Sequence, residues 1–224
     1  SEPNIREGAA ATLGLMTFVV NVVLASYVFA GERPELLLGE IVPGYAIAFR
    51  VEPLGMVFAL VASGLWVLTT VYAAGYMRAH HESHQTRFFA CFPVAIFAAL
   101  AAAYSANLFT LFIAYELMTV STYPLVTHNG DEEARRGGRI YLGILLSTSI
   151  ALFMLAIAWT QSLAGTLDFR EGGILESAYR SERVGNFGLA LLLGGFAYGI
   201  GKAALMPIHR WLPAAMVAPA PVSA

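Results

Sequence analysis

Residues 186–213 read NFGLALLLGGFAYGIGKAALMPIHRWLP, an apolar run that contains the only lysine of the chain, Lys202. Because a helix needs about 20 mostly apolar residues to cross a bilayer, we expect a membrane span at 186–205. An ionisable group at bilayer depth costs roughly 2.5–3.5 kcal/mol on insertion scales, so it is seldom kept without a function. Pro207 and Pro213 follow the lysine, and we expect the helix to open beside the ammonium group.

A second apolar run, at 108–126, reads LFTLFIAYELMTVSTYPLV and carries Glu116, the only acidic residue within such a stretch. Thr119 and Tyr123 lie three and seven positions later, so they share a helix face with Glu116. Pro124 lacks an N–H group and frees a backbone carbonyl close by. We expect this polar stripe to hold water for proton transfer; the alternative is a carboxyl that only hydrogen-bonds a neighbouring helix.

The composition places the chain in a membrane. Hydrophobic residues make up 58% and charged residues 12% of the sequence, and the charged fraction of soluble domains is about 25%. A net charge of −2 gives no sign of nucleic-acid binding. Cys91 is the only cysteine, which rules out an intrachain disulfide. The chain starts at Ser1 and stops at Ala224 inside an apolar stretch, so we expect an internal fragment of a longer polypeptide.

The remaining apolar runs predict an all-α, polytopic transmembrane bundle forming one domain over 1–224. The expected spans are 8–30, 53–77, 88–104, 108–127, 140–163 and 186–205, followed by a broken segment at 207–224. Residues 32–52 alternate in polarity around Pro43-Gly44, which predicts a short hairpin on the membrane surface. Residues 166–183 are mixed in character and predict an interfacial loop with a short helix.

The arginines give a weak preference for orientation. Loops on the side of the N-terminus hold Arg6, Arg78, Arg87, Arg135, Arg136 and Arg139, and the opposite loops hold Arg33, Arg50, Arg170, Arg180 and Arg183. Because positively charged loops tend to stay in the cytoplasm, we expect a cytoplasmic start. We expect a multi-pass protein of the bacterial inner membrane.

Each candidate group also has a structural explanation. Lys202 can release a proton when it is desolvated, or its side chain can simply extend to the membrane interface. His209 follows it by seven residues and would share its face if the helix continued across Pro207. An imidazole titrates near neutrality and suits a proton relay, but it can equally orient a helix by a hydrogen bond. The histidines at 80–84 have metal-ligand spacing but no accompanying carboxylate pattern, so we expect a solvated loop and no metal site.

Three motifs resemble the antiporter-like membrane subunits of respiratory complex I, membrane-bound hydrogenases and Mrp-type sodium/proton antiporters. They are FTLFIAYELMTVSTY at 109–123, GKAALMPIHRWLP at 201–213 and APAPVSA at 218–224. The resemblance covers essentially the whole chain and implies the second to the seventh helix, and the start of the eighth, of a bundle of about fourteen.

The resemblance also implies roles for individual residues. Glu116 matches the glutamate of the fifth helix and Lys202 the lysine of the broken seventh helix, which in the family are thought to form an ion pair that controls the proton affinity of the lysine. His209 matches a histidine on the lateral water path. Ala214 departs from the pattern, because many relatives carry an acidic residue there. The redox centres of the family lie in other subunits, so we expect no cofactor on this chain.

We therefore expect a proton-translocating subunit that works with other membrane subunits, with Glu116, Lys202 and His209 as its proton relay. Two alternatives remain open: an Mrp-type exchanger that also moves sodium, and a scaffold in which Glu116 and Lys202 form a static bridge. An interaction module at the 80–84 loop is a further possibility that metal analysis would test.

Overall fold

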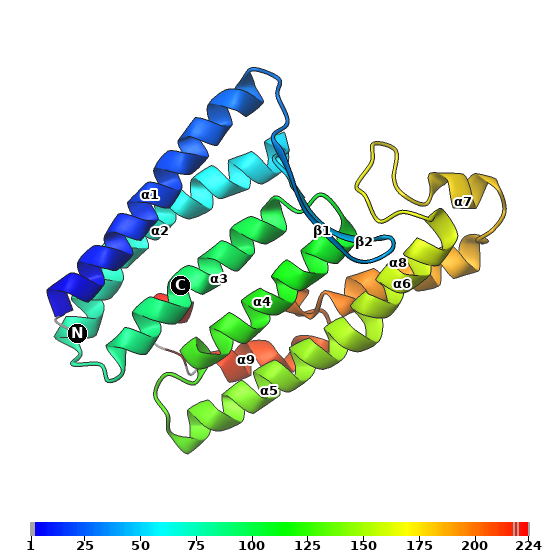
Figure 1. Ribbon diagram of the computed structural model, residues 1–224. Coiled ribbons are helices and arrows are strands. Elements are labelled where there is room, and N and C mark those ends of the chain that lie inside the picture. The colour runs from blue at the N-terminus through cyan, green and yellow to red at the C-terminus, as the bar shows by residue number, and fades with distance from the viewer. Residues whose placement is uncertain (1–2, 217, 219, 224) are drawn as a thin grey trace.

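Most of the described chain is helical, and one β-hairpin interrupts the series of helices (Figure 1). The computed structural model describes residues 3–216, 218 and 220–223. The α-helices are α1 (Pro3–Phe29), α2 (Pro53–Ala79), α3 (Gln85–Ala103), α4 (Leu108–Val126), α5 (Glu132–Thr148), α6 (Leu155–Ala164), α7 (Glu176–Arg180), α8 (Asn186–Gly199), α9 (Trp211–Ala215) and α10 (Ala220–Ser223). The strands are β1 (Glu35–Val42) and β2 (Tyr45–Arg50), and the irregular helices are η1 (Ser149–Met154), η2 (Gly201–Ala203) and η3 (Ile208–Arg210).

Five helices of the described chain are long and apolar enough to cross a membrane. They are α1, α2, α3, α4 and the continuous helix Glu132–Ala164, which comprises α5, η1 and α6. Neighbours in sequence pack against one another from α1 to α5, so these helices form a row (Figure 1). The predicted all-α polytopic bundle, with a short hairpin and a broken helix near its C-terminal end, is confirmed.

Side-chain caps and prolines mark where the central helices begin. Pro53 occupies the first turn of α2, where its missing N–H group removes no helical hydrogen bond. The side chain of Asn107 accepts a hydrogen bond of 2.8 Å from the Thr110 N–H group at the start of α4. Asp131 caps α5 in the same way by accepting from Ala134 N–H at 2.7 Å. The capping carboxylate starts α5 at Glu132, eight residues before the expected span, because a polar first turn at the membrane surface can be helical.

The β-hairpin is fastened to the connection between α3 and α4. Val42 pairs with Tyr45, so Pro43 and Gly44 form the turn, and Gly44 has the positive φ of 84° that this turn requires. The Ala48 N–H group donates to Thr110 Oγ1 at 2.9 Å, and Asn107 Nδ2 donates to the Ala46 carbonyl at 3.1 Å. The hairpin therefore holds the first turn of α4 from outside the helical row.

Buried polar side chains join α1, α2 and α3 at membrane depth. Asn21 Nδ2 donates to Ser63 Oγ at 3.1 Å, and the Tyr104 hydroxyl donates to Asn21 Oδ1 at 2.9 Å. Ser63 Oγ in turn donates to the Ala59 carbonyl at 2.5 Å. We call Asn21, Ser63 and Tyr104 the polar lock. Its members satisfy one another, as buried polar groups in hydrocarbon must.

The backbone is irregular at two places in the last third of the chain, which lie against each other. The helix from Glu132 contains a π-helical section, η1, and α8 ends at Gly199 instead of continuing to 205. Beyond it, η2 lies within the expected span, and residues 204–207 separate it from η3, which α9 follows directly. The elements η3 and α9 fall in the segment that was expected to be broken. Of that segment, residues 217, 219 and 224 lie outside the described residues.

Candidate functional site

Lys202 sits in the break after α8, and its ammonium group turns towards α4. The Lys202 Nζ donates to the Thr119 hydroxyl and, at 3.2 Å, to the Tyr115 carbonyl. It also lies 3.6 Å from the centre of the Tyr115 ring, which is within cation–π range. Because the side chain is only partly exposed and bonds across helices, it does not extend to the interface as a snorkelling lysine would.

The backbone of the break is held by aromatic side chains. The Lys202 N–H group donates to the Tyr115 hydroxyl at 3.0 Å, and Trp211 Nε1 donates to the Gly201 carbonyl at 2.9 Å. Ala204 adopts a left-handed conformation with φ of 51°, which ends η2. Tyr115 therefore contacts the lysine three times, through its ring, its hydroxyl and its carbonyl.

Close packing against the continuous helix leaves no room for side chains at two glycines. A Cβ atom at Gly199 would lie 2.5 Å from the backbone nitrogen of Phe153, within η1. A Cβ atom at Gly201 would lie 2.5 Å from Thr148 Oγ1. The end of α8 and the π-helical section η1 thus pack backbone against backbone, next to Lys202. π-helical turns inside α-helices are frequently found at functional sites.

Glu116 lies one residue after Tyr115, and one of its carboxyl oxygens is buried. Glu116 Oε1 has no hydrogen-bond partner among the described residues. The expected direct ion pair between Glu116 and Lys202 is not formed, because Thr119 and the Tyr115 carbonyl hold the ammonium group instead. The two charges nevertheless lie within electrostatic range of each other. We call Tyr115, Glu116, Thr119 and Lys202 the lysine site.

A second set of hydroxyl groups adjoins the lysine site on α5. The buried Tyr141 hydroxyl is hydrogen-bonded to the Thr122 hydroxyl, and it lies within electrostatic range of Glu116. The Tyr141 ring meets Trp211 edge to face at 5.7 Å. Hydroxyl groups both donate and accept hydrogen bonds, so this pair adds polar groups to the surroundings of Glu116.

The remaining predicted groups lie away from the lysine site. His209 is exposed in η3, and the chain between η2 and η3 is not helical, so the imidazole does not continue the face of Lys202. Among the described residues no cluster of His, Cys, Asp and Glu could hold a metal ion. His80 stacks on Tyr76 with ring centres 4.2 Å apart, and Cys91 is a partly buried free thiol on α3.

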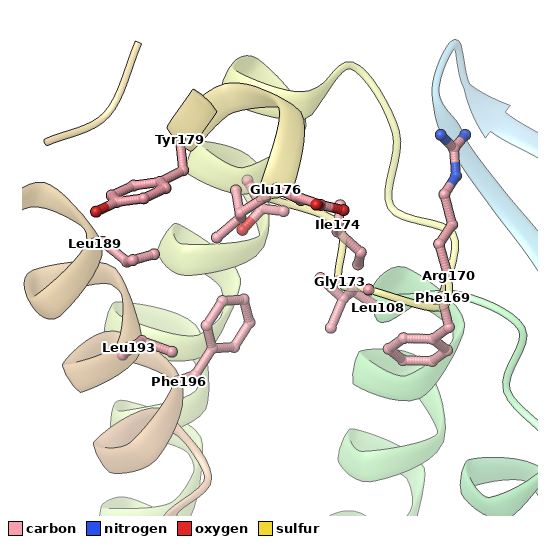
Figure 2. Close-up of a pocket in the computed structure, with 13 residues that line it drawn as sticks. Leu108, Phe169, Arg170, Gly173, Ile174, Glu176, Tyr179, Leu189, Leu193 and Phe196 are labelled. Carbon is pink, nitrogen blue, oxygen red and sulfur yellow. The ribbon is translucent and has the colours of Figure 1, made fainter. Parts of the chain in front are cut away.

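A large apolar cavity of about 600 Å³ lies beneath the 165–180 loop on the hairpin side (Figure 2). Leu108 and Phe196 are among its lining residues, whereas Glu116 and Lys202 are not. Figure 2 shows Arg170 extending away from the apolar side chains. The cavity is therefore separate from the lysine site.

Two protein-family models match most of the chain. Residues 105–224 match the model described as "NADH:quinone oxidoreductase/Mrp antiporter, TM", and residues 44–89 match "NADH-Ubiquinone oxidoreductase (complex I), chain 5 N-terminus". The first match covers more than half of the chain and includes the whole lysine site. The chain belongs to the NADH:quinone oxidoreductase/Mrp antiporter family. It is thus an integral, multi-pass membrane protein.

The curated relatives include subunits of cation/proton antiporters and of NADH-quinone oxidoreductases. The chain is 29% identical over 229 residues to the A/B subunit of a probable K(+)/H(+) antiporter of Rhizobium meliloti (strain 1021), covering 99% of this chain and 22% of the relative. It is 28% identical over 207 residues to NADH-quinone oxidoreductase subunit N of Desulforudis audaxviator (strain MP104C), covering 91% of this chain and 40% of the relative. The chain therefore spans well under half of these relatives.

Solved structures of two complexes share the fold. An archaeal membrane-bound sulfane sulfur reductase matches with a TM-score of 0.79 at 18% identity, covering 97% of this chain and 43% of that chain. The Mrp complex from Dietzia sp. DQ12-45-1b matches with a TM-score of 0.78 at 19% identity, covering 97% of this chain and 23% of that chain. Both neighbours are multi-subunit assemblies by their descriptions.

Sequence reasoning missed two parts of the site in this family member. Tyr115 stood beside Glu116 in the quoted motif, but an aromatic residue in an apolar helix gives no signal that its carbonyl and ring will bind an ammonium group. Tyr141 lies in the expected fifth span, and its burial opposite Glu116 depends on the packing of α4 against α5. A tyrosine at the start of an apolar run, about three turns from the helix cap at Asp131, was the available signal.

Proposed function

We propose that this chain forms part of a proton-translocating, antiporter-like subunit in which Lys202 binds and releases a transported proton. One observation carries the proposal: the only lysine of the chain is enclosed by Tyr115 and Thr119 beside the buried, unpartnered carboxyl oxygen of Glu116. Membrane-embedded ionisable residues that face a bundle interior generally mark ion or proton pathways.

The ammonium group has a proton to give. It carries three N–H donors, and two of them have acceptors in Thr119 and Tyr115. The third can donate to water and pass its proton on, which leaves a neutral amine whose lone pair accepts the next proton. The same Thr119 hydroxyl can then turn and donate to that lone pair, because a hydroxyl is both donor and acceptor.

Glu116 controls how readily that exchange occurs. Opposite charges attract more strongly in the low-dielectric interior of a protein than in water, so an ionised Glu116 carboxylate favours the charged form of the lysine. Moving the carboxylate away, or protonating it through Tyr141, removes the attraction and drives the lysine proton onward. Its return recharges the lysine.

The transport unit is proposed to be a multi-subunit complex in a bacterial inner membrane, with the Arg6 side of the bundle in the cytoplasm. The similar structures are complexes, and both named relatives are subunits of bacterial proteins. His209 remains a predicted relay residue. Its exposed imidazole follows the break and can meet water there.

A cation/proton exchanger is the second candidate function. It is favoured by the similarity to the Mrp complex and to the probable K(+)/H(+) antiporter. In that case the proton still binds at Lys202, and a sodium or potassium ion moves in the opposite direction. Flux that stops when both alkali cations are removed would indicate the exchanger.

The test is proton flux in vesicles that contain the complete complex with Lys202→Ala or Glu116→Gln. We expect flux to fall at least tenfold while native gels show an assembled complex. Glu132→Gln is the matched control, since Glu132 is an exposed carboxylate paired with Arg139 at 3.1 Å outside the apolar section, and it should leave flux unchanged. Normal flux combined with weakened assembly in the Lys202 variant would instead identify a static structural contact.

A further inference from the structure

A groove runs along the membrane face of the bundle between α1 and α3, outside the lysine site. Two adjoining cavities of about 280 and 310 Å³ share Leu13 of α1 and Pro93 of α3, so they form one continuous depression. Its polar end lies at Arg6 and Thr86, and its apolar end lies at Phe97. We call this depression the α1–α3 groove.

The polar end of the groove holds two arginines that share one carboxylate. The Glu7 carboxylate accepts two hydrogen bonds from Arg78, at 2.5 and 3.0 Å, and a longer one of 3.5 Å from Arg6. Arg6 also donates to two neutral groups, Gln85 Oε1 at 2.5 Å and Thr86 Oγ1 at 3.4 Å. Two guanidinium groups thus face one carboxylate, which leaves a local excess of positive charge.

One donor at this end lacks a partner. The Arg6 side chain is 12% exposed, and its Nε atom is buried with no hydrogen-bond partner among the described residues. The guanidinium also lies 5.3 Å from the centre of the Phe89 ring, which holds it over the groove. An anion at the mouth of the groove would balance the excess positive charge of the two guanidinium groups, although the buried Nε atom is not open to it.

The length of the groove indicates what kind of molecule fits. From Arg6 to Thr17 the groove follows α1 for eleven residues, or about 16 Å, which is about half of the ~30 Å hydrocarbon core. The length and the apolar lining of the groove therefore match a single hydrocarbon chain within one leaflet.

We propose that the α1–α3 groove binds one anionic phospholipid, with its phosphate at Arg6 and an acyl chain between α1 and α3. The walls along the chain are apolar, and Leu13 and Phe97 are 46% and 62% exposed. Trp66 of α2 is buried against Gly14, and its ring closes the groove on the side of α2. This site is separate from the proton site, and it stands or falls independently of the proposed function.

The experiment uses the assembled complex in vesicles with a phosphatidylglycerol that carries a photoreactive group midway along one acyl chain. We expect adducts on the α1 and α3 peptides that contain Leu13 and Phe97. Arg6→Gln should reduce them at least threefold, and phosphatidylcholine with the same reactive chain should label at least threefold less. Arg33→Gln serves as the matched control, because Arg33 lies beyond the other end of α1 and pairs with Glu52 at 3.5 Å.

A second variant tests the apolar part without touching the charge. Ala9→Phe places a ring in the groove while Arg6 keeps its contacts, and we expect it to reduce labelling as strongly as Arg6→Gln does. Adducts that are equal for both lipids and unaffected by Arg6→Gln would overturn the proposal. So would labelling of this face by another protein of the complex in place of lipid.

Discussion

In the unit formed by α1, α2 and α3, the polar lock joins Asn21, Ser63 and Tyr104 through mutual hydrogen bonds. Around the break after α8 the arrangement is different, because Lys202 is held by a hydroxyl and a backbone carbonyl while Glu116 keeps an unpartnered oxygen. The first region has one satisfied arrangement and holds helices together. The second leaves a carboxyl oxygen of Glu116 without a partner, as the proposed proton transfer requires.

The helices of the two regions also differ in the regularity of their backbone. The helices α1 and α2 are each regular over 27 residues, whereas the continuous helix beyond Asp131 contains η1 and α8 ends after 14 residues. Backbone irregularity among these helices thus lies on the side of the lysine site, and the contrast between the two regions can be tested by mutation.

The largest effect is expected at the contact between the two irregular elements. Gly199→Ala would place a Cβ atom 2.5 Å from the Phe153 nitrogen, so the backbone of α8 or η1 must move. We expect about 1–3 kcal/mol of lost stability and a clear drop in thermal stability of the purified complex, together with lost flux. Gly194→Ala on the same helix is the control, since a Cβ atom there meets nothing within 4 Å. Equal melting temperatures for the two variants would contradict the close packing.

Two buried threonines make a matched pair across the two regions. Thr119 Oγ1 donates to the Tyr115 carbonyl at 3.0 Å, and Thr70 Oγ1 donates to the Trp66 carbonyl at 2.9 Å, so both bond within their own helix. Only Thr119 also accepts from the Lys202 ammonium. A hydrogen bond to a charged group contributes about 1.5–3 kcal/mol, so we expect Thr119→Val to reduce proton flux roughly tenfold or more and Thr70→Val to leave it within about twofold.

The readout for this pair is the initial rate of vesicle acidification at fixed driving force, with assembly checked on native gels. A similar rate for both valine variants would show that the Thr119 hydroxyl is a helix-packing group and has no part in holding the ammonium.

The smallest effect is expected from a buried histidine at the end of α4. His128, just beyond α4, is fully buried, and the pKa of its imidazole lies below the ordinary value of 6.5 because of burial and the nearby Arg87 charge. The other charged or titratable groups near the ring are Glu82 and His84, and Glu82 and the Ser83 backbone favour the protonated form more weakly. The unfolded chain therefore takes up a proton at higher pH than the folded chain.

Stability should consequently fall as the pH drops below about 6.5 towards the lower folded-state pKa, and it should be constant for this group at higher pH. We expect thermal unfolding between pH 7.5 and 5.5 to show this loss, and His128→Gln to flatten it. The exposed His80 provides the control, because His80→Gln should leave the slope unchanged. A slope that is unaffected by His128→Gln would show that burial of this imidazole is not what couples stability to pH.

The sequence predicted the elements that depend on polarity and on special residues. The Pro43-Gly44 turn, the short α3–α4 connection and the break beyond Lys202 each follow from residues whose conformational limits are known. The end of α8 at Gly199 was not predicted, because the apolar run continues to 205 and glycine alone does not stop a membrane helix. The π-helical η1 has no compositional mark, since its residues are ordinary helix-forming apolar and hydroxyl types.

Glu116, Thr119 and Lys202 were singled out from the sequence as candidates, whereas Tyr115 and the contacts within the site were not. A lone lysine and a lone glutamate in apolar runs identified the charged members, since burial without function is costly there. The acceptors of Lys202 could not be identified, because a carbonyl oxygen belongs to every residue and side-chain geometry decides which one lies near the ammonium. His209 was expected on the face of Lys202 only for a continuous helix, and residues 204–207 interrupt it.

Hydrogen bonds that join the hairpin to Asn107 and Thr110 fix the position of the start of α4. Glu116 lies eight residues beyond Leu108, or about 12 Å along the axis, so a tilt of roughly 10° about that point would swing its carboxylate by roughly 2 Å. Such a swing is enough to exchange a direct ion pair for a separated one. The extramembrane hairpin would then be the fixed point about which α4 tilts. Loosening the hairpin would impair the proposed transport without altering Glu116 or Lys202.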